Sequence, residues 1–351
     1  MKRGHRFLAY SLGAVASASA AGRLLVRRDA RRPDPDAREL LGSARGTPRW
    51  IRGPRGSELY VEEFPGAGPH GGTVIFTHGW CLTEAVWHFQ KIDLAGNGFS
   101  MLTWDLPGHG HSRPVPHGRL TLDLAAAALE RVIEEAGGDV VLVGHSLGGV
   151  ITLAHVARAA PEVRRRVRGM VLISTPLMHF ARSVAGRWPG ASVEARALGT
   201  MVRVLVESDL IDRLLVKDVG KQEVTRLSYR IIRQGFGRDA SPSQVRFLRD
   251  VIASVPPSVR QDTLRVMTGY DMTPHLATLD VPALVVVGER DRLVNPEESK
   301  LLASALPRSR LLVLPDTGHA AFLEARVELG RELRRFVERR LGRPGAGAGS
   351  A

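Results

Sequence analysis

The chain has 351 residues, 44% of them hydrophobic, and a formal net charge of +13. This length suits one large globular domain, or one domain that carries an inserted subdomain. The single cysteine, Cys81, excludes an intramolecular disulfide bond and a zinc cluster built on cysteines. The stability of the protein must therefore come from a packed hydrophobic core.

The positive charge is concentrated at the N-terminus. Eleven Lys or Arg and four Asp or Glu fall within residues 1–49, so this segment carries +7 and the other 302 residues carry only +6. No basic stripe interleaved with aromatic residues, of the kind that follows a phosphate backbone, occurs along the chain. We therefore expect no nucleic acid among the partners of this protein.

The N-terminal segment has the layout of a targeting or anchoring sequence. Three basic residues precede an uncharged run over residues 7–22, which ends in small residues as a secretory signal does. Five arginines between positions 23 and 32 follow at once, and such a flank tends to stay on the cytoplasmic side. The run is also shorter than the ~20 apolar residues of a spanning helix. We expect residues 1–32 to associate the protein with a membrane; secretion after cleavage and a cytoplasmic location are the alternatives.

After a Pro- and Gly-containing linker over residues 33–48, short apolar runs alternate with amphipathic helical periods. This alternation predicts an α/β fold, a mostly parallel eight-stranded sheet flanked by helices. Gly and Pro between the first two strands favour an antiparallel hairpin at the sheet edge. The expected strands are Trp50–Ile51, Glu58–Phe64, Thr73–Thr77, Phe99–Trp104, Val140–Val143, Met170–Ile173, Leu284–Val287 and Leu311–Leu314. The expected helices between them are Glu84–Leu94, Thr121–Ala136, Leu147–Ala159, Glu297–Ala305 and Ala320–Leu341.

One interval breaks the alternation. Residues 177–279 contain no convincing buried strand, only helical stretches, so they predict a helical cap inserted after the sixth strand. Such a cap would lie over the carboxyl edge of the sheet, where ligands bind in open α/β folds. Residues 49–176 and 280–341 then form the core, and the Gly/Ala-rich residues 342–351 form a disordered tail. The helical stretches of the expected cap are 191–215, 221–234, 243–253 and 258–268.

The strongest functional signal is the motif Gly-His-Ser-Leu-Gly at residues 144–148, which follows an expected strand and opens an expected helix. A serine on such a sharp turn has a strained backbone, and glycine is needed at the flanking positions, here Gly144 and Gly148, because a Cβ would collide with the neighbouring helix and strand. The motif therefore predicts Ser146 as a nucleophile. Since a free hydroxyl is a weak nucleophile, the site must also supply a base, a carboxylate and oxyanion donors.

The carboxylate and the base are expected after later strands, in the order serine, acid, histidine. Asp291 and His319 follow the last two expected strands and satisfy this order. Their positions predict that they complete a catalytic triad. Their neighbours Glu289 and Asp316 are interpreted as turn or surface residues.

Two backbone amides are predicted to hold the oxyanion. One belongs to Leu147, at the N-terminus of the helix that follows the nucleophile. The other is expected after the third strand, where Gly79 permits a turn that presents the amide of Trp80, with Cys81 as the less favoured donor. His78 fits a structural histidine bonded to the backbone better than a second base.

Five segments together carry a resemblance to a known family: HGW, WDLPGHGHS, GHSLGG, GERD and DTGH, which begin at residues 78, 104, 144, 288 and 316. Over residues 49–341 the chain resembles the α/β-hydrolase superfamily, in the branch of capped esterases, lipases and cofactor-free haloperoxidase-like enzymes. The resemblance implies that Asp105, with Gly108, Gly110 and Ser112, forms a structural turn rather than part of the reactive site.

We expect a serine hydrolase that cleaves carboxylic esters, lipid esters or thioesters included, through an acyl-enzyme and with no metal or organic cofactor. Haloalkane dehalogenases and epoxide hydrolases of this family attack with an aspartate at the nucleophile position. Because this position is Ser146 here, these two activities are excluded. Peptidase and acyltransferase or perhydrolase activity on the same triad remain alternatives, as does a non-catalytic binding module. The expected partners are a small-molecule or lipid ester and a membrane surface, and the sequence indicates no oligomeric state.

Overall fold

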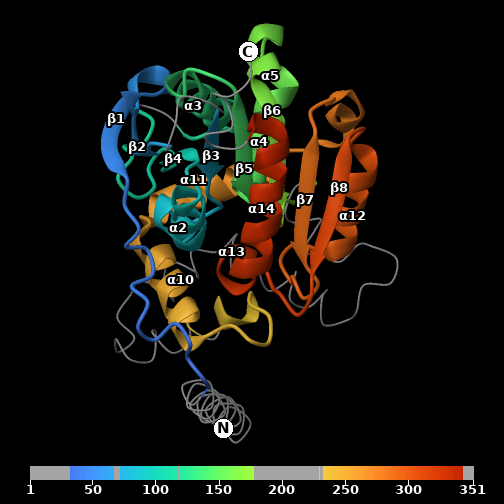
Figure 1. The fold of residues 1–351 in the computed structure, drawn as a ribbon. Helices are drawn as coiled ribbons and strands as arrows, with labels where there is room; N and C mark the ends of the chain where they lie inside the picture. The colour runs from blue at the N-terminus through green and yellow to red at the C-terminus, as the bar shows by residue number, and fades with distance from the viewer. Residues whose placement is uncertain (1–31, 67–71, 117–118, 178–228, 230–231, 343–351) are drawn as a thin grey trace, which may run out of the picture.

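The computed structural model describes residues 32–66, 72–116, 119–177, 229 and 232–342. A single sheet of eight strands runs through the molecule with helices on both faces (Figure 1). Its strand order is β1-β2-β4-β3-β5-β6-β7-β8. The strands are β1 (Thr47–Arg52), β2 (Glu58–Phe64), β3 (Thr73–Thr77), β4 (Ser100–Trp104), β5 (Val140–His145), β6 (Val167–Ile173), β7 (Ala283–Gly288) and β8 (Ser309–Leu314).

The sheet is mostly parallel, as predicted. Strands β4, β3, β5, β6, β7 and β8 pair in parallel, while β1 and β2 form an antiparallel hairpin that joins β4 at the edge. The hairpin closes over a single 3₁₀ turn, Pro54–Gly56, where the Gly53 amide donates to the Ser57 carbonyl oxygen at 2.7 Å. The carboxyl ends of the six parallel strands therefore meet at one edge of the sheet.

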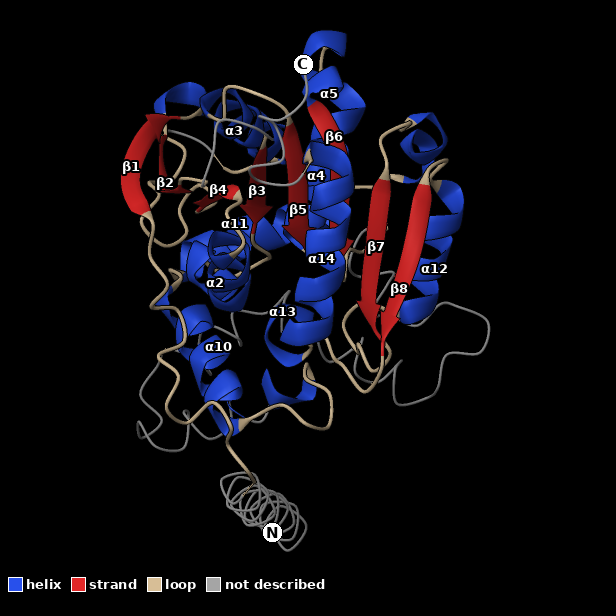
Figure 2. Ribbon diagram, in the orientation of Figure 1, coloured by secondary structure: helices blue, strands red, loops and turns tan. Residues whose placement is uncertain are grey.

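Helices cover the two faces because side chains alternate along each strand. Ile75 of β3 belongs to a core with α3, α4 and α12, whereas its neighbours Val74 and Phe76 belong to a second core with α2, α13 and α14 (Figure 2). The helices are η2 (Glu84–Trp87), α2 (His88–Gly96), α3 (Leu122–Glu135), α4 (Leu147–Arg158), α5 (Pro161–Arg166), α10 (Pro242–Ser254), α11 (Pro257–Thr268), η3 (Thr273–Thr278), α12 (Pro296–Ala305), α13 (Ala321–Glu324) and α14 (Arg326–Leu341).

Two expected helices are not continuous. The stretch over 84–94 begins with the 3₁₀ turn η2 and becomes α-helical only in α2. The stretch over 320–341 is interrupted at Ala325, whose φ of −108° and ψ of 36° lie outside the α-helical region. The interruption lets α13 place Phe322 against Trp87 and His145, with ring centroids 5.6 and 4.8 Å away, while α14 runs along the sheet.

The insertion between β6 and β7 is described only in part. Its helices α10 and α11 correspond to the stretches expected at 243–253 and 258–268, and α10 lies beyond the carboxyl ends of the strands (Figure 2). The helices expected over 191–215 and most of 221–234 lie outside the described residues, as do the N-terminal apolar run and residues 343–351 of the expected tail. Within the described ranges, no helix is long and apolar enough to cross a membrane.

The segment expected as a linker contacts the insertion closely. The carboxylate of Asp36, a residue only 2% exposed, accepts hydrogen bonds from Ser241 Oγ at 2.7 Å and Gln244 Nε2 at 2.9 Å, and also from the Arg326 guanidinium. These contacts join the N-terminal segment to the start of α10 and the start of α14. The residues before β1 therefore lie along the protein surface at the carboxyl end of the sheet.

A cluster of charged groups is buried beneath this segment. The ammonium of Lys91, which is fully buried on α2, contacts Glu62 of β2 at 3.0 Å and also Glu84 of η2. Arg45 pairs with both carboxylates, and the Tyr60 hydroxyl donates to Glu62 Oε1 at 2.8 Å. Burial opposes the ionisation of Glu62, but Lys91 and these hydrogen bonds outweigh it and lower the pKa of Glu62. The cluster joins β2, η2, α2 and the N-terminal segment.

We predict that Lys91→Met lowers the free energy of unfolding by about 3–5 kcal/mol, because it leaves the two buried carboxylates of Glu62 and Glu84 with only the half-exposed Arg45 as a cation. Urea unfolding of both proteins measures the loss. The control is Lys300→Met, which breaks a half-exposed pair with Glu297 and should cost less than about 1 kcal/mol. Equal losses in the two variants would contradict this role for Lys91.

Candidate active site

Ser146 lies on the sharp turn between β5 and α4, at the carboxyl edge of the sheet. Its φ of 51° and ψ of −116° are unusual for a residue with a Cβ, and it is 5% exposed. The turn is held on both sides. The Ser146 amide donates to the carbonyl oxygen of Ile173 at 2.9 Å, and its own carbonyl accepts from the Gly149 amide at 3.0 Å.

The glycines around Ser146 are needed for close backbone approach. A Cβ on Gly144 would lie 2.5 Å from the carbonyl oxygen of Gly148, and one on Gly148 would lie 2.2 Å from the carbonyl oxygen of Thr77. A Cβ on Gly79 would lie 2.7 Å from the ring of His145. Strand β3, its following loop and the start of α4 therefore meet at contact distances that no larger residue allows.

Asp291 and His319 come together from the loops after β7 and β8. His319 Nδ1 lies 2.9 Å from Asp291 Oδ2 and 3.2 Å from Oδ1. Because a carboxylate accepts only, Nδ1 carries the proton and Nε2 is left as the basic nitrogen. Asp291 is fixed in turn by the amides of Leu293 and Val294, each 2.9 Å from Oδ1.

The histidine loop lies directly against the turn that carries Ser146. The ring of His145, the residue before the serine, has its centroid 4.7 Å from that of His319 and donates from Nε2 to the His319 carbonyl oxygen at 3.0 Å. Burial, and then the neighbouring His319, lower the pKa of His145 well below its ordinary value, so this ring is neutral. In the described part of the chain, no hydrogen bond joins His319 to Ser146 itself.

The two amides predicted as oxyanion donors flank the same turn. Leu147 is the first residue of α4, so its amide has no intrahelical acceptor, and neither it nor the Trp80 amide bonds to any group in the described ranges. The indole Nε1 of Trp80 donates to the carbonyl oxygen of Arg260 in α11 at 2.9 Å. The loop that carries Trp80 is therefore bonded to the insertion between β6 and β7. The next residue, Cys81, is buried with a φ of 56°.

His78 is structural, as expected. Its Nδ1 lies 2.8 Å from the carbonyl oxygen of Gly79, and its Nε2 accepts from the amide of Leu106 at 3.0 Å. Burial, with the nearby His109, lowers the pKa of His78 well below its ordinary value. Both ring nitrogens are therefore occupied by the backbone, and the neutral ring joins the loops that follow β3 and β4.

Asp105 forms the turn that the family resemblance implies. Its carboxylate accepts from the Glu84 amide at 2.8 Å and the His111 amide at 2.9 Å. Gly110 has a φ of 48°, and a Cβ there would lie 2.1 Å from Asp105 Oδ2. Burial, and then Glu84, raise the pKa of Asp105 to about 7. The residue organises the loop after β4 and contacts no member of the predicted triad.

Sequence reasoning missed Glu324, which braces the histidine loop. Its carboxylate, at the end of α13, accepts from the Gly318 amide at 3.1 and 3.2 Å and from the Gly237 amide at 2.5 Å. The His319 amide donates to Gly235 at 2.7 Å, so the loop is also bonded to the segment that leads into α10. Burial is the main cause that raises the pKa of Glu324 to about 7. No motif in the sequence marks this residue, since its partners lie in two separate loops.

The comparisons with known proteins concern the family and the fold. Residues 74–331 match the family model described as the alpha/beta hydrolase family. A pimeloyl-[acyl-carrier protein] methyl ester esterase from Stenotrophomonas maltophilia is 31% identical over 271 residues, which cover 76% of this chain and 93% of that protein. An esterase from Thermogutta terrifontis is 26% identical with a TM-score of 0.65, covering 83% of this chain and 98% of that one. An esterase from Exiguobacterium antarcticum, 21% identical, shares the fold with a TM-score of 0.67 over 82% of this chain and 98% of its own.

The chain belongs to the alpha/beta hydrolase family. Within this family it is a carboxylesterase-like enzyme. The fold class and the family resemblance expected from the sequence are thereby confirmed.

We predict that Gly148→Ala destabilises the protein by more than about 3 kcal/mol, because the new Cβ must displace the Thr77 carbonyl oxygen or the start of α4. Thermal and urea unfolding measure the change. The matched control is Gly96→Ala, also at a helical position but with nothing within 4 Å of the added Cβ. That variant should be neutral or slightly stabilised, and a similar cost at both sites would refute the steric argument.

Glu324 should make stability depend on pH. Because its pKa is about 7 in the folded protein and 4.5 for an ordinary Glu, the folded state holds an extra proton between these values. Its contribution to the free energy of unfolding therefore falls as pH rises from about 4.5 to about 7, by up to about 3 kcal/mol.

Glu324→Gln removes this titration, so the stability difference between variant and wild type should shift in favour of the variant between pH 5 and pH 8. Urea unfolding at several pH values measures it, with Glu328→Gln on α14 as the control for loss of one carboxylate. A pH-independent difference would contradict the assignment.

Proposed function

We propose that the protein is a serine hydrolase of carboxylic esters that works through an acyl-enzyme on Ser146, His319 and Asp291. The observation that carries the proposal is the hydrogen-bonded His319–Asp291 pair, packed against the strained turn of Ser146 at the carboxyl edge of the sheet. A strained serine turn, a histidine in a defined tautomer and a buried carboxylate are the parts that acyl transfer requires.

Acylation begins when Ser146 Oγ attacks the ester carbonyl carbon. Nε2 of His319 takes the hydroxyl proton, and the resulting imidazolium is stabilised by Asp291 across the 2.9 Å contact. The tetrahedral intermediate then collapses, and the leaving alcohol departs with the proton from His319. Water, deprotonated by the same nitrogen, attacks the acyl-enzyme and releases the acid and Ser146.

The amides of Leu147 and Trp80 would receive the oxyanion of both tetrahedral intermediates. Neither has another acceptor in the described chain, so both can donate without breaking an existing bond. The Leu147 amide also stands at the N-terminus of a 12-residue helix, whose dipole favours negative charge. Loss of one such donor typically lowers kcat by about 10²–10³-fold.

The substrate is proposed as a class of esters rather than as a single molecule. The similarity to a pimeloyl-[acyl-carrier protein] methyl ester esterase at 31% identity supports a carboxylic ester with a small alcohol portion. Lipid esters and thioesters pass through the same tetrahedral intermediate and need no further residue. The insertion between β6 and β7 would select among them, because α11 contacts the Trp80 loop and the segment before α10 contacts the His319 loop.

Ser146→Ala should abolish labelling of the purified protein by a fluorophosphonate probe and lower ester turnover by at least about 10³-fold. Ser174→Ala is the matched control, because Ser174 is also buried, follows the adjacent strand and has a positive φ of 47°. The control should keep both labelling and turnover. Turnover of Ser146→Ala within tenfold of wild type would overturn the assignment.

p-Nitrophenyl esters of increasing chain length then define the acyl group, and an acyl thioester and a peptide anilide extend the series. Turnover of the esters with little cleavage of the anilide is the expected pattern. Faster cleavage of the anilide would favour a peptidase.

Membrane association through residues 1–32 is a separate proposal, supported by the apolar run and its arginine flank. The full chain should sediment with vesicles of phosphatidylglycerol and phosphatidylcholine, and deletion of residues 1–32 should abolish this while soluble-ester turnover is retained. Equal sedimentation of the two proteins would contradict it.

A further inference from the structure

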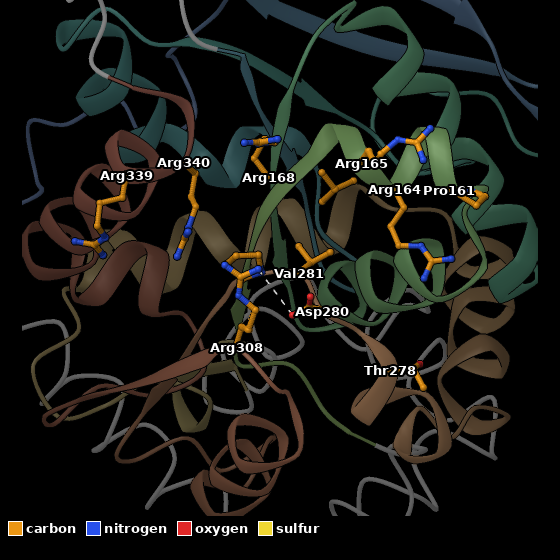
Figure 3. A pocket seen from close by; sticks show the side chains of 12 residues that line it. Pro161, Arg164, Arg165, Arg168, Thr278, Asp280, Val281, Arg308, Arg339 and Arg340 are labelled. Atoms are coloured by element: carbon orange, nitrogen blue, oxygen red, sulfur yellow. Dashed lines mark ion pairs between the residues drawn. The ribbon is translucent and has the colours of Figure 1, made fainter.

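The amino-terminal edge of the sheet carries a hollow of about 490 Å³, at the opposite end of the strands from Ser146 (Figure 3). It is formed by α5, the start of β6, the loop between η3 and β7, the residue before β8 and the end of α14. None of these parts contributes to the ester site. The volume lies within the range of small-molecule sites in proteins.

The lining of this arginine hollow is strongly cationic. It contains one carboxylate, Asp280, so the lining has a net charge of +5. Figure 3 shows Arg339 and Arg340 on one side of the hollow and Arg164 and Arg165 on the other. The six arginines are Arg164, Arg165, Arg168, Arg308, Arg339 and Arg340.

Carboxylates of the protein neutralise this charge only weakly. The contact of Arg308 with Asp280 is 3.8 Å long, and that of Arg168 with Asp139 is 3.6 Å. Arg165 and Arg339 have no ion pair with a described residue. Several arginines elsewhere on the described surface have closer partners, such as Arg265 with Asp262 at 2.7 Å and Arg246 with Asp34 at 3.0 Å.

The arginines are also close enough to repel one another. Burial, and then the charges of Arg308, Arg339 and Arg168, lower the pKa of Arg340. The Nε atoms of Arg340 and Arg164 are buried and lack a hydrogen-bond acceptor within the described chain. Since buried polar atoms are normally paired, these donors and the uncompensated charge both point to an anion.

We propose that the arginine hollow binds a soluble di- or triphosphate. Guanidinium groups present planar forks that bind phosphoryl oxygens in pairs, and several of them surround the space from different elements. A ligand with linked phosphoryl groups supplies enough negative charge to neutralise several arginines at once. A soluble ligand is favoured over a lipid headgroup because the arginines line a concave site.

Isothermal titration of the full chain with pyrophosphate, at constant ionic strength, tests the proposal. We expect saturable binding that weakens at least tenfold in the double variant Arg168→Gln/Arg308→Gln. The control is Arg131→Gln/Arg265→Gln, which removes the same charge from side chains that are similarly exposed, at 43% and 53% against 52% and 54%. The control should change the dissociation constant less than twofold.

Three results would overturn the proposal: no saturable binding by wild type, equal weakening in the two double variants, or phosphatidylglycerol-vesicle binding that Arg168→Gln/Arg308→Gln loses but pyrophosphate does not compete. Melting temperatures of the free proteins confirm that all variants are folded. Repeating the titration with Ser146→Ala, where binding should be unchanged, keeps the result independent of ester hydrolysis.

Discussion

The backbone conformation of Ser146 is the constraint on which the rest of the site depends. A positive φ at a residue with a Cβ costs about 1–3 kcal/mol and persists only where the surroundings leave no alternative. Here the parallel register supplies those surroundings, because β3, β5 and β6 end level with one another and the Ser146 amide bonds to Ile173. Gly148 then lets α4 start against the Thr77 carbonyl, directly after the serine turn.

Both loops that flank this turn are bonded to the insertion between β6 and β7. The loop that carries Trp80, which we propose as an oxyanion donor, is held through the Trp80 indole, which donates to the carbonyl oxygen of Arg260 in α11. The His319 loop is held through Gly235 and through Glu324, which also bonds Gly237. The element that would select the substrate and the loops that would perform the chemistry therefore share hydrogen bonds. A change in the insertion can alter the position of the base as well as the shape of the substrate site.

The two edges of the sheet differ in how far their charged groups are paired with opposite charges. At the carboxyl edge, burial keeps the rings of His78 and His145 neutral, and Asp291 is matched by His319 and two amides. Beneath the N-terminal segment, Lys91 is matched by two buried carboxylates. At the amino edge the arginines face one another with a single lining carboxylate. The charges of Lys91 and Asp291 are neutralised within the fold. The arginines of the hollow repel one another instead, and an anionic ligand would relieve that repulsion.

The sequence by itself determined those features that depend on local pattern. Short apolar runs placed all eight strands, and glycine spacing marked the turn of Ser146, because close backbone approach excludes any side chain there. Chain order after strands was enough to indicate Asp291 and His319, since parallel strands bring their following loops to one edge.

Only the tertiary structure decided the contacts between distant segments. No periodicity in the sequence relates the partners in these contacts. Examples are the bond between Glu324 and Gly237, the ion pair between Lys91 and Glu62, and the cluster of six arginines in the hollow. Nor did the pattern show the break at Ala325, where packing of Phe322 against two rings outweighs helix continuity. Such features are set by how the helices and loops pack on the sheet, which a local pattern cannot encode.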